Sequence, residues 1–364
     1  AAARMFDRRT RTSVVLLYAW CRHCDDEIDG QILGHGAIGV DPRMAAEKLD
    51  QLRARTASAL AGEPQVDPVF IAFQRVALRH AIPAQEAMDL LRGFEMDVMG
   101  RRYDRLEDTL DYAYHVAGVV GVMMARIMGV SDAETLRRAQ DLGLAFQLTN
   151  IARDVMEDAR GGRVYLPGDW LEQAGVPADR VGAPEHRDAV ARAAQRLVAA
   201  AEPFYASARW GLRDLNPRSA WAIATARGVY RAIGRRVAES GPRAWDGRAS
   251  VDRAGKLMLL GRGGLITIWS KTLDAWRAPP PRPVLGERRQ DRALARDDGQ
   301  VAPHVPRRGR GDAVPGLVQQ LDPAGVAPQH GGDAFGHHRR QDAARLDAQV
   351  HRLDRVQLEH AFAQ

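Results

Sequence analysis

The stretch Gln-Leu-Thr-Asn-Ile-Ala-Arg-Asp-Val-Met-Glu-Asp, residues 147–158, decides the fold. Its apolar residues recur with the period of an α-helix, and Asn150, Asp154 and Asp158 interrupt them at intervals of four. Residues four apart stand one above the other on a helix, separated by about 6 Å of rise. Oxygen ligands in a row, without sulfur or histidine beside them, suit a hard cation such as Mg²⁺, which completes its shell with water and phosphate. The stretch therefore predicts a helix that presents metal ligands to a phosphate-bearing substrate.

A second acidic array lies near the start of the chain. Asp25 and Asp29 are again four apart and follow the apolar run Val-Val-Leu-Leu-Tyr-Ala-Trp at 14–20. Carboxylates at this spacing also occur on many solvated helix faces, where they contribute only solubility. Here, however, like charges four apart would destabilise a bare helix, and two such arrays occur beside apolar residues. We interpret them as two halves of one site that holds several metal ions and a diphosphate between them.

Three motifs resemble those of the squalene/phytoene synthase family. They are Tyr-Ala-Trp-Cys-Arg-His-Cys-Asp-Asp-Glu-Ile-Asp at 18–29, Tyr-His-Val-Ala-Gly-Val-Val-Gly at 114–121, and residues 143–167, which end in Tyr-Leu-Pro. The similarity runs in order from the first residues to about Pro283 and is to the bacterial enzymes of carotenoid synthesis within that family. The resemblance implies an all-α, single-domain, isoprenoid-synthase-like helical bundle around a central cavity.

The resemblance also implies a prenyltransferase that joins two geranylgeranyl diphosphates head to head to give phytoene. The first substrate loses diphosphate, the double bond of the second captures the allylic cation, and the resulting prephytoene diphosphate ionises in turn. Each leaving diphosphate has to be neutralised by Mg²⁺, or by Mn²⁺ in its place. No NADPH is expected, because phytoene needs no reductant.

Two alternatives remain open at this point. One is a synthase that makes squalene, dehydrosqualene or presqualene diphosphate from farnesyl diphosphate, since no motif reports the depth of the cavity. The other is a non-catalytic scaffold or assembly protein of the same family. Such a protein would be expected to have lost some carboxylates, and both arrays are complete.

The expected metal ligands, of which the aspartates would also serve catalysis, are Asp25, Asp29, Asn150, Asp154 and Asp158. Arg22 lies one turn before Asp25. Arg153 is the neighbour of Asp154, and both guanidinium groups would bind phosphate oxygens of the substrate. Alternatively, each arginine pairs with its neighbouring carboxylate and relieves repulsion.

Further site residues follow from the resemblance. Three tyrosines match residues that line the reaction cavity of related enzymes, and each could instead be a half-buried packing residue. They are Tyr18, Tyr112 and Tyr230. Gln147 would bind substrate from the same helix face as Asn150. Arg248 and Lys256 match basic, substrate-binding residues late in the domain.

Composition is that of a globular protein, with 45% hydrophobic residues, 27% charged residues and a formal net charge of +6. We find no secretory signal and no run of roughly 18 apolar residues, which a membrane span needs. We therefore expect a cytoplasmic protein that contacts the inner face of the cell membrane peripherally, because its substrate and product are lipids. Nucleic acid is not an expected partner, since no nucleic-acid-binding motif accompanies the basic excess. The sequence indicates no oligomeric state.

Apolar periodicity predicts a series of helices without a strand pattern. They are expected at 4–29, 42–60, 68–80, 83–99, 110–128, 131–160, 184–208 and 217–239. Ser131 and Glu134 have the spacing of a capping box at the start of the helix that carries Asn150. Small residues such as Gly118 and Gly121 indicate either close helix packing or the wall of a lipid-sized tunnel.

The chain divides into a synthase domain, residues 1–285, and a tail, residues 286–364. The tail lacks Lys, Ile, Met, Tyr, Trp, Cys, Asn, Ser and Thr, and Arg, Asp, Ala, Gly and Pro predominate. Such a segment buries little, so we expect disorder and suspect a shifted reading frame. At the other end, related chains begin with a Ser-x-Ser-Phe-like segment before the first helix. The present chain starts at Ala1, close to that helix, and we expect such a segment to be needed to close the diphosphate site.

Overall fold

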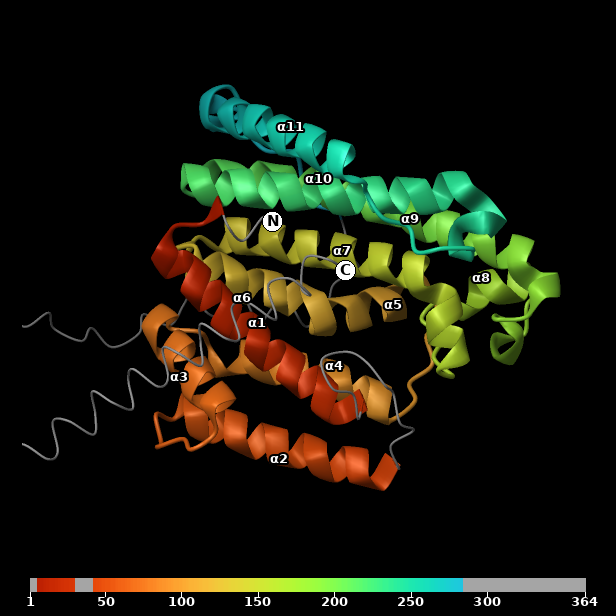
Figure 1. Ribbon diagram of the computed structural model, residues 1–364, viewed down its shortest axis with the longest axis horizontal. Helices are drawn as coiled ribbons and strands as arrows, with labels where there is room; N and C mark the ends of the chain where they lie inside the picture. Colours follow the sequence, from red (N-terminus) through yellow and green to blue (C-terminus); the bar gives the residue numbers. More distant parts are fainter. Residues whose placement is uncertain (1–4, 30–41, 284–364) are drawn as a thin grey trace, which may run out of the picture. The chain divides into compact units, whose positions relative to one another are not determined.

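The computed structural model describes residues 5–29 and 42–283. The predicted tail at 286–364 lies outside the described residues, so its disorder stays a prediction. Within the described ranges every regular element is a helix, and the predicted all-α fold class is confirmed (Figure 1).

The helices fall close to the ranges that periodicity predicts. The α-helices are α1 (Arg8–Asp29), α2 (Pro42–Leu60), α3 (Pro68–His80), α4 (Ala84–Val98), α5 (Leu106–Ala113), α6 (Val119–Ile127), α7 (Ala133–Arg160), α8 (Gly168–Gln173), α9 (Arg187–Gly211), α10 (Pro217–Ser240) and α11 (Arg253–Thr272). A π-helical turn, η2 (Tyr114–Gly118), joins α5 to α6, and short 3₁₀ turns include η5 (Leu212–Asp214), η6 (Gly241–Trp245) and η7 (Asp274–Trp276). None of the described helices is long and apolar enough to cross a bilayer.

Helix α7 is the central element of the described residues. It packs against α5, α6, α9 and α10, while α1 packs against α2, α3, α4 and α6 (Figure 1). Leu144, Leu148 and Ile151 of α7 are almost fully buried. A helix that is apolar on most of its circumference needs neighbours on all sides, which explains why the acidic stretch lies inside the bundle rather than on its surface.

The segment from α5 to α6 was predicted as one helix over 110–128. It begins earlier, at Leu106, and contains the π-helical turn η2. A methyl group added to Gly121 would overlap the carbonyl oxygen of Ala139, and one added to Gly143 would overlap that of Ala117. The glycines therefore let the backbones of α6, η2 and α7 approach closely, which is the first of the two predicted roles for the small residues.

Two details of the sequence-based prediction were wrong. The N-cap of α7 is Asp132, whose carboxylate accepts a hydrogen bond from the Thr135 amide at 2.8 Å, so Ser131 does not start a capping box. Helix α11 was not predicted, because its four glycines weaken the helical pattern. One of them, Gly263, lies where a side chain would overlap Thr225 of α10, and this close contact explains why the helix tolerates it.

Candidate functional site

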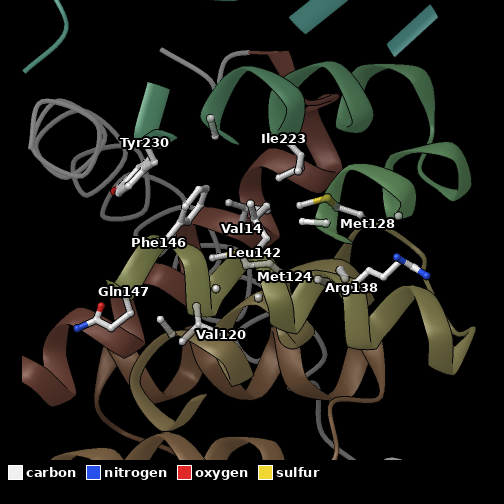
Figure 2. Close-up of a pocket in the computed structure, with 18 of the residues that line it drawn as sticks. Val14, Val120, Met124, Met128, Arg138, Leu142, Phe146, Gln147, Ile223 and Tyr230 are labelled. Carbon is white, nitrogen blue, oxygen red and sulfur yellow. The ribbon is translucent and has the colours of Figure 1, made fainter. Parts of the chain in front are cut away.

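A cavity of about 370 Å³ lies between α1, η2, α6, α7, α9 and α10. Its wall consists mainly of apolar or small side chains, including Val14, Val120, Met124 and Leu142 (Figure 2). Gly121, like the residues just named, lines the wall, so the small residues of α6 also fulfil the second predicted role. The lining of α7 extends from Thr135 to Asn150, a rise of about 22 Å along the helix. The cavity is therefore long, narrow and suited to an apolar chain.

One end of the cavity, which we call the polar end, is lined by Tyr18, Gln147, Asn150 and Tyr230. Figure 2 shows Tyr230 and Gln147 at this end, with Phe146 beside the tyrosine. The rings of Phe146 and Tyr230 stack with their centroids 4.2 Å apart. The four lining residues come from α1, α7 and α10, so three helices meet here.

Tyr18 and Tyr230 each lie near one of the two predicted acidic arrays, so both arrays are close to the polar end. Burial raises the pKa of Tyr18 to about 12, and the charges of Arg22 and Asp25 act on it as well. Burial likewise raises the pKa of Tyr230, on which the charges of Arg153 and Asp154 act. Each tyrosine thus lies beside one array, and Tyr230 also contributes to the pKa of Tyr18. Both hydroxyl groups keep their protons at neutral pH.

The first array lies near the C-terminal end of α1. Arg22 forms ion pairs of 2.9 Å with Asp25 and with Asp26, so the alternative role considered for this arginine is present. Asp29 is the last residue of α1, and its side chain lies outside the described part of the structure.

The second array follows one face of α7. The Nε atom of Arg153 donates a hydrogen bond of 2.8 Å to Oδ1 of Asp154. Burial, and after it the charge of Asp154, raise the pKa of Asp158 to about 8, although Arg163 opposes this shift. The buried Oδ1 atom of Asn150 accepts no hydrogen bond from any described residue. The array therefore brings together carboxyl and amide oxygens that the protein itself does not fully satisfy.

These features fit divalent cations at the polar end. All candidate ligands are oxygen atoms, one of them is an unpartnered buried amide oxygen, and burial together with the charge of Asp154 raises the pKa of Asp158. Among the described residues, no three His, Cys, Asp or Glu side chains form a metal-binding group on their own. Substrate phosphate and water would have to complete the coordination shell, as is usual for Mg²⁺.

Tyr112 is not among the described residues that line the cavity. Its hydroxyl donates a hydrogen bond of 3.0 Å to Asp97, and the Tyr165 hydroxyl donates one of 2.8 Å to the same carboxylate. The two rings stack with centroids 4.6 Å apart. Asp97 adds, after burial and Asp154, to the raised pKa of Asp158, so this cluster lies close to the second array. Sequence analysis missed Asp97, whose only signal was an acidic residue within the apolar pattern of 83–99.

The two basic residues predicted late in the domain are exposed. Arg248 lies between α10 and α11, and its charge lowers the pKa of Tyr230, which places it near the polar end. Lys256 is on α11, which packs against α10. In the described structure, Arg248 is thus close enough to the polar end for its charge to act on Tyr230, and no such interaction is seen for Lys256.

The opposite end, which we call the closed end, contains a buried charged network that sequence analysis also missed. Arg138 lines the cavity, yet only 3% of its surface is exposed (Figure 2). Its guanidinium donates to the carbonyl oxygens of Ser207, at 3.2 Å, and Pro280, at 3.0 Å. Asp141, fully buried, accepts one hydrogen bond of 2.5 Å from the Ser207 hydroxyl and two, of 2.6 and 2.9 Å, from the Arg282 guanidinium. The network fastens residues 280–283 to α7 and α9 at the closed end.

Comparisons with known proteins agree with this geometry. The family model described as squalene/phytoene synthase matches residues 1–255. The 15-cis-phytoene synthase of Pantoea ananas is 53% identical over 283 residues, which cover 78% of this chain and 90% of that protein. That of Paracoccus sp. (strain N81106 / MBIC 01143) is 55% identical over 263 residues, or 72% of this chain and 85% of that protein. A crystal structure of a dehydrosqualene synthase in complex with ligand superposes with a TM-score of 0.63 at 27% identity, covering 72% of this chain and 88% of that one.

The fold and the sequence similarity are those of enzymes that handle prenyl diphosphates. The chain belongs to the squalene/phytoene synthase family. The predicted family and the predicted enzyme class, a prenyltransferase, are confirmed. Between the two enzymatic alternatives, the relatives named above favour phytoene formation over a reaction of farnesyl diphosphate.

Proposed function

We propose that this chain condenses two molecules of geranylgeranyl diphosphate head to head to phytoene, with divalent cations, Mg²⁺ or Mn²⁺, at the polar end. The observation that carries the proposal is a cavity whose polar end is lined by the amide oxygen of Asn150, unpartnered among the described residues, and whose apolar wall extends about 22 Å along α7. A diphosphate fits the first part and a long prenyl chain fits the second.

The metal side of the site consists of Asp25, Asp29, Asn150, Asp154 and Asp158. When bound, the cations would stabilise negative charge on the leaving diphosphate. Arg22 and Arg153 already point their guanidinium groups at carboxylates of these arrays. When a carboxylate binds a cation, it releases N–H groups of the arginine that was paired with it. Both arginines could then donate hydrogen bonds to phosphate oxygens of the substrate.

The remaining residues protect the cation that forms when the carbon–oxygen bond breaks. Tyr18 and Tyr230 are neutral, because burial raises both pKa values, so neither presents a phenolate that would attack the cation. Their rings, with that of Phe146, offer π-faces to positive charge. The apolar wall excludes water, which would otherwise quench the cation. Gln147 orients the substrate from the same face as Asn150, and Tyr112 holds Asp97 behind the second array.

Two further parts of the proposal concern partners and place in the cell. No reductant is needed for phytoene, so the reaction uses geranylgeranyl diphosphate and cations alone. We further propose a cytoplasmic enzyme in peripheral contact with the membrane, since both substrate and product are lipids. A non-catalytic scaffold is disfavoured because both acidic arrays are complete.

Product analysis tests the proposal. Purified protein is incubated with geranylgeranyl diphosphate and Mg²⁺, with and without a chelator, and with farnesyl diphosphate in parallel; the organic extract is analysed by mass. We expect phytoene that disappears with chelator and in Asp154→Asn, while Glu172→Gln, an exposed control on α8, remains active. Products from farnesyl diphosphate alone would contradict the substrate, and the absence of any product from either would favour the scaffold.

A further inference from the structure

Helix α11 presents an apolar face to solvent in the described part of the structure. Seven large apolar side chains on α11 and the adjoining η7 are 46 to 92% exposed. We call them the α11 face: Leu257, Met258, Leu265, Ile268, Trp269, Leu273 and Trp276. Single exposed apolar residues are ordinary, but a contiguous group of this size marks an interaction surface.

The orientation of this face is fixed by the packing of α11 on α10. The opposite side of α11 is buried through Leu259, Gly263 and Thr267. Trp221 of α10 donates a hydrogen bond of 2.8 Å to the carbonyl oxygen of Leu260. On a helical projection the exposed positions from Leu257 to Leu273 fall on the side opposite Leu259, Gly263 and Thr267, so the α11 face points away from α10.

Helix α10 also connects this face to the cavity. Ile223, Ala226 and Tyr230 of α10 line the cavity on the side that packs against α7. Helix α11 packs on α10 as well, and Figure 1 shows it on the side away from α7. Helices α11 and α10 therefore lie between the α11 face and the prenyl cavity.

The charged side chains within helix α11 are all basic, and the exposed Asp252 caps its first turn. Between residues 253 and 273 the sequence has four basic residues and no Asp or Glu. Arg253, Lys256 and Arg262 are exposed. The next carboxylate, Asp274, is buried and paired with Arg209. A partner of this surface has to combine an apolar interior with a negatively charged rim.

We infer that the α11 face docks on an anionic lipid bilayer, with its apolar side chains in the headgroup region and its basic side chains against lipid phosphates. The composition supports lipid over a protein partner, since Leu and Ile along the stripe and Trp at one end, flanked by Arg and Lys, are typical of interfacial helices. A second copy of the chain would bring the same positive charges against each other. The inference extends the membrane contact of the proposed function by naming the surface, and it also stands on the surface alone.

Vesicle sedimentation of the full chain tests the inference. Vesicles of phosphatidylcholine mixed with phosphatidylglycerol are compared with vesicles of phosphatidylcholine alone. We expect binding to the anionic vesicles, little binding to the neutral ones, and a decrease of binding with added salt. A double variant, Leu265→Asp with Ile268→Asp, should bind the anionic vesicles with an affinity reduced at least roughly tenfold, because two apolar side chains are lost from the interface with the lipid.

Matched variants separate this effect from unfolding. Met44→Asp with Leu78→Asp places the same charges at exposed apolar positions on α2 and α3, and should leave vesicle binding unchanged. Arg253→Gln with Arg262→Gln should lose the preference for anionic lipid without changing the melting temperature. Circular dichroism of each variant shows whether it is folded.

The outcomes distinguish this inference from the proposed reaction. Activity is measured on geranylgeranyl diphosphate in detergent micelles, where the Leu265→Asp, Ile268→Asp variant should match the unsubstituted protein. Vesicle binding without phytoene formation would contradict only the reaction. Phytoene formation by a chain that does not bind anionic vesicles would overturn the inference. Self-association would also overturn the inference. If the unsubstituted protein forms a larger species at higher concentration and the double variant does not, the α11 face joins copies of the chain.

Discussion

The two ends of the cavity both contain charged groups, but they differ in how well these groups are partnered. At the closed end, Arg138 and Asp141 are almost completely buried, yet each has several protein partners. At the polar end, Asn150 has an amide oxygen without a partner in the described structure, and Asp158 has a pKa raised to about 8. Buried polar groups that are satisfied by the protein stabilise a fold, whereas those left unsatisfied mark the place of a ligand. Both ends contain buried charged groups, so burial alone does not show which end binds the ligand.

The largest effect should come from the polar end. Asp154→Asn keeps the shape of the side chain but removes a charge that the reaction needs, so we expect phytoene formation to fall by about a thousandfold or more. The free energy of unfolding should fall by only about 1–2 kcal/mol, because asparagine can still accept a hydrogen bond from the mostly buried Arg153. Steady-state kinetics and urea unfolding measure the two quantities. If Asp154→Asn lost activity only because it unfolds, the contrast between a reactive polar end and a structural closed end would be contradicted.

The closed end should behave in the opposite way. Asp141→Ala leaves Arg282 and Ser207 without their buried acceptor, and the free energy of unfolding should fall by about 3–5 kcal/mol. The folded fraction should keep its activity within an order of magnitude, because the network does not contact the diphosphate end. Urea unfolding with activity measured below the transition tests this. A stable but inactive variant would place Asp141 in the reaction instead.

A smaller effect is expected in the wall between the two ends. Gly143→Ala would force α6 and η2 away from α7, because the added methyl group overlaps the carbonyl oxygen of Ala117. We expect a loss of about 1–3 kcal/mol in the free energy of unfolding. The matched control is Gly261→Ala on α11, where the added methyl group meets open space. That variant should gain roughly 0.5–1 kcal/mol, and a similar loss in both would show that the close approach is not the cause.

The smallest effect should come from the tyrosine behind the second array. Tyr112→Phe removes one of the two tyrosine hydrogen bonds to Asp97 and keeps the stacked ring, so stability should fall by about 1 kcal/mol. Activity should decrease only several-fold, since the Tyr112 hydroxyl acts on the second array only through Asp97. Thermal unfolding and kinetics measure both quantities. A loss as large as that of Asp154→Asn would make Tyr112 a reacting group rather than a positioning residue.

The polar end could largely be predicted from sequence, because its residues repeat at helical spacing. Asn150, Asp154 and Asp158 are four apart on α7, and local periodicity alone places them on one face. Helices such as α3 and α10 could be predicted within a residue or two for the same reason, since Pro68 and Pro217 mark their starts.

The closed end could not be predicted, because its contacts join residues far apart in the chain. Asp141 and Arg282 are separated by 141 positions, and nothing local in the sequence indicates that they meet. Helix α11 was missed because its glycines favour a loop until their packing on α10 is known. Tyr112 was matched to the cavity by resemblance, whereas the structure places its hydroxyl on Asp97. Tertiary packing decides each of these cases, and sequence pattern does not report it.

The polar end should bind diphosphate through divalent cations, and calorimetry with inorganic diphosphate measures this binding without the rest of the reaction. The full chain is titrated with diphosphate in the presence of Mg²⁺ and again with a chelator, and the titrations are repeated with Asp154→Asn and with the closed-end variant Asp141→Asn. We predict binding that requires Mg²⁺, is lost in Asp154→Asn and is retained by folded Asp141→Asn. Diphosphate binding that persists with chelator, or that Asp154→Asn leaves unchanged, would contradict the account.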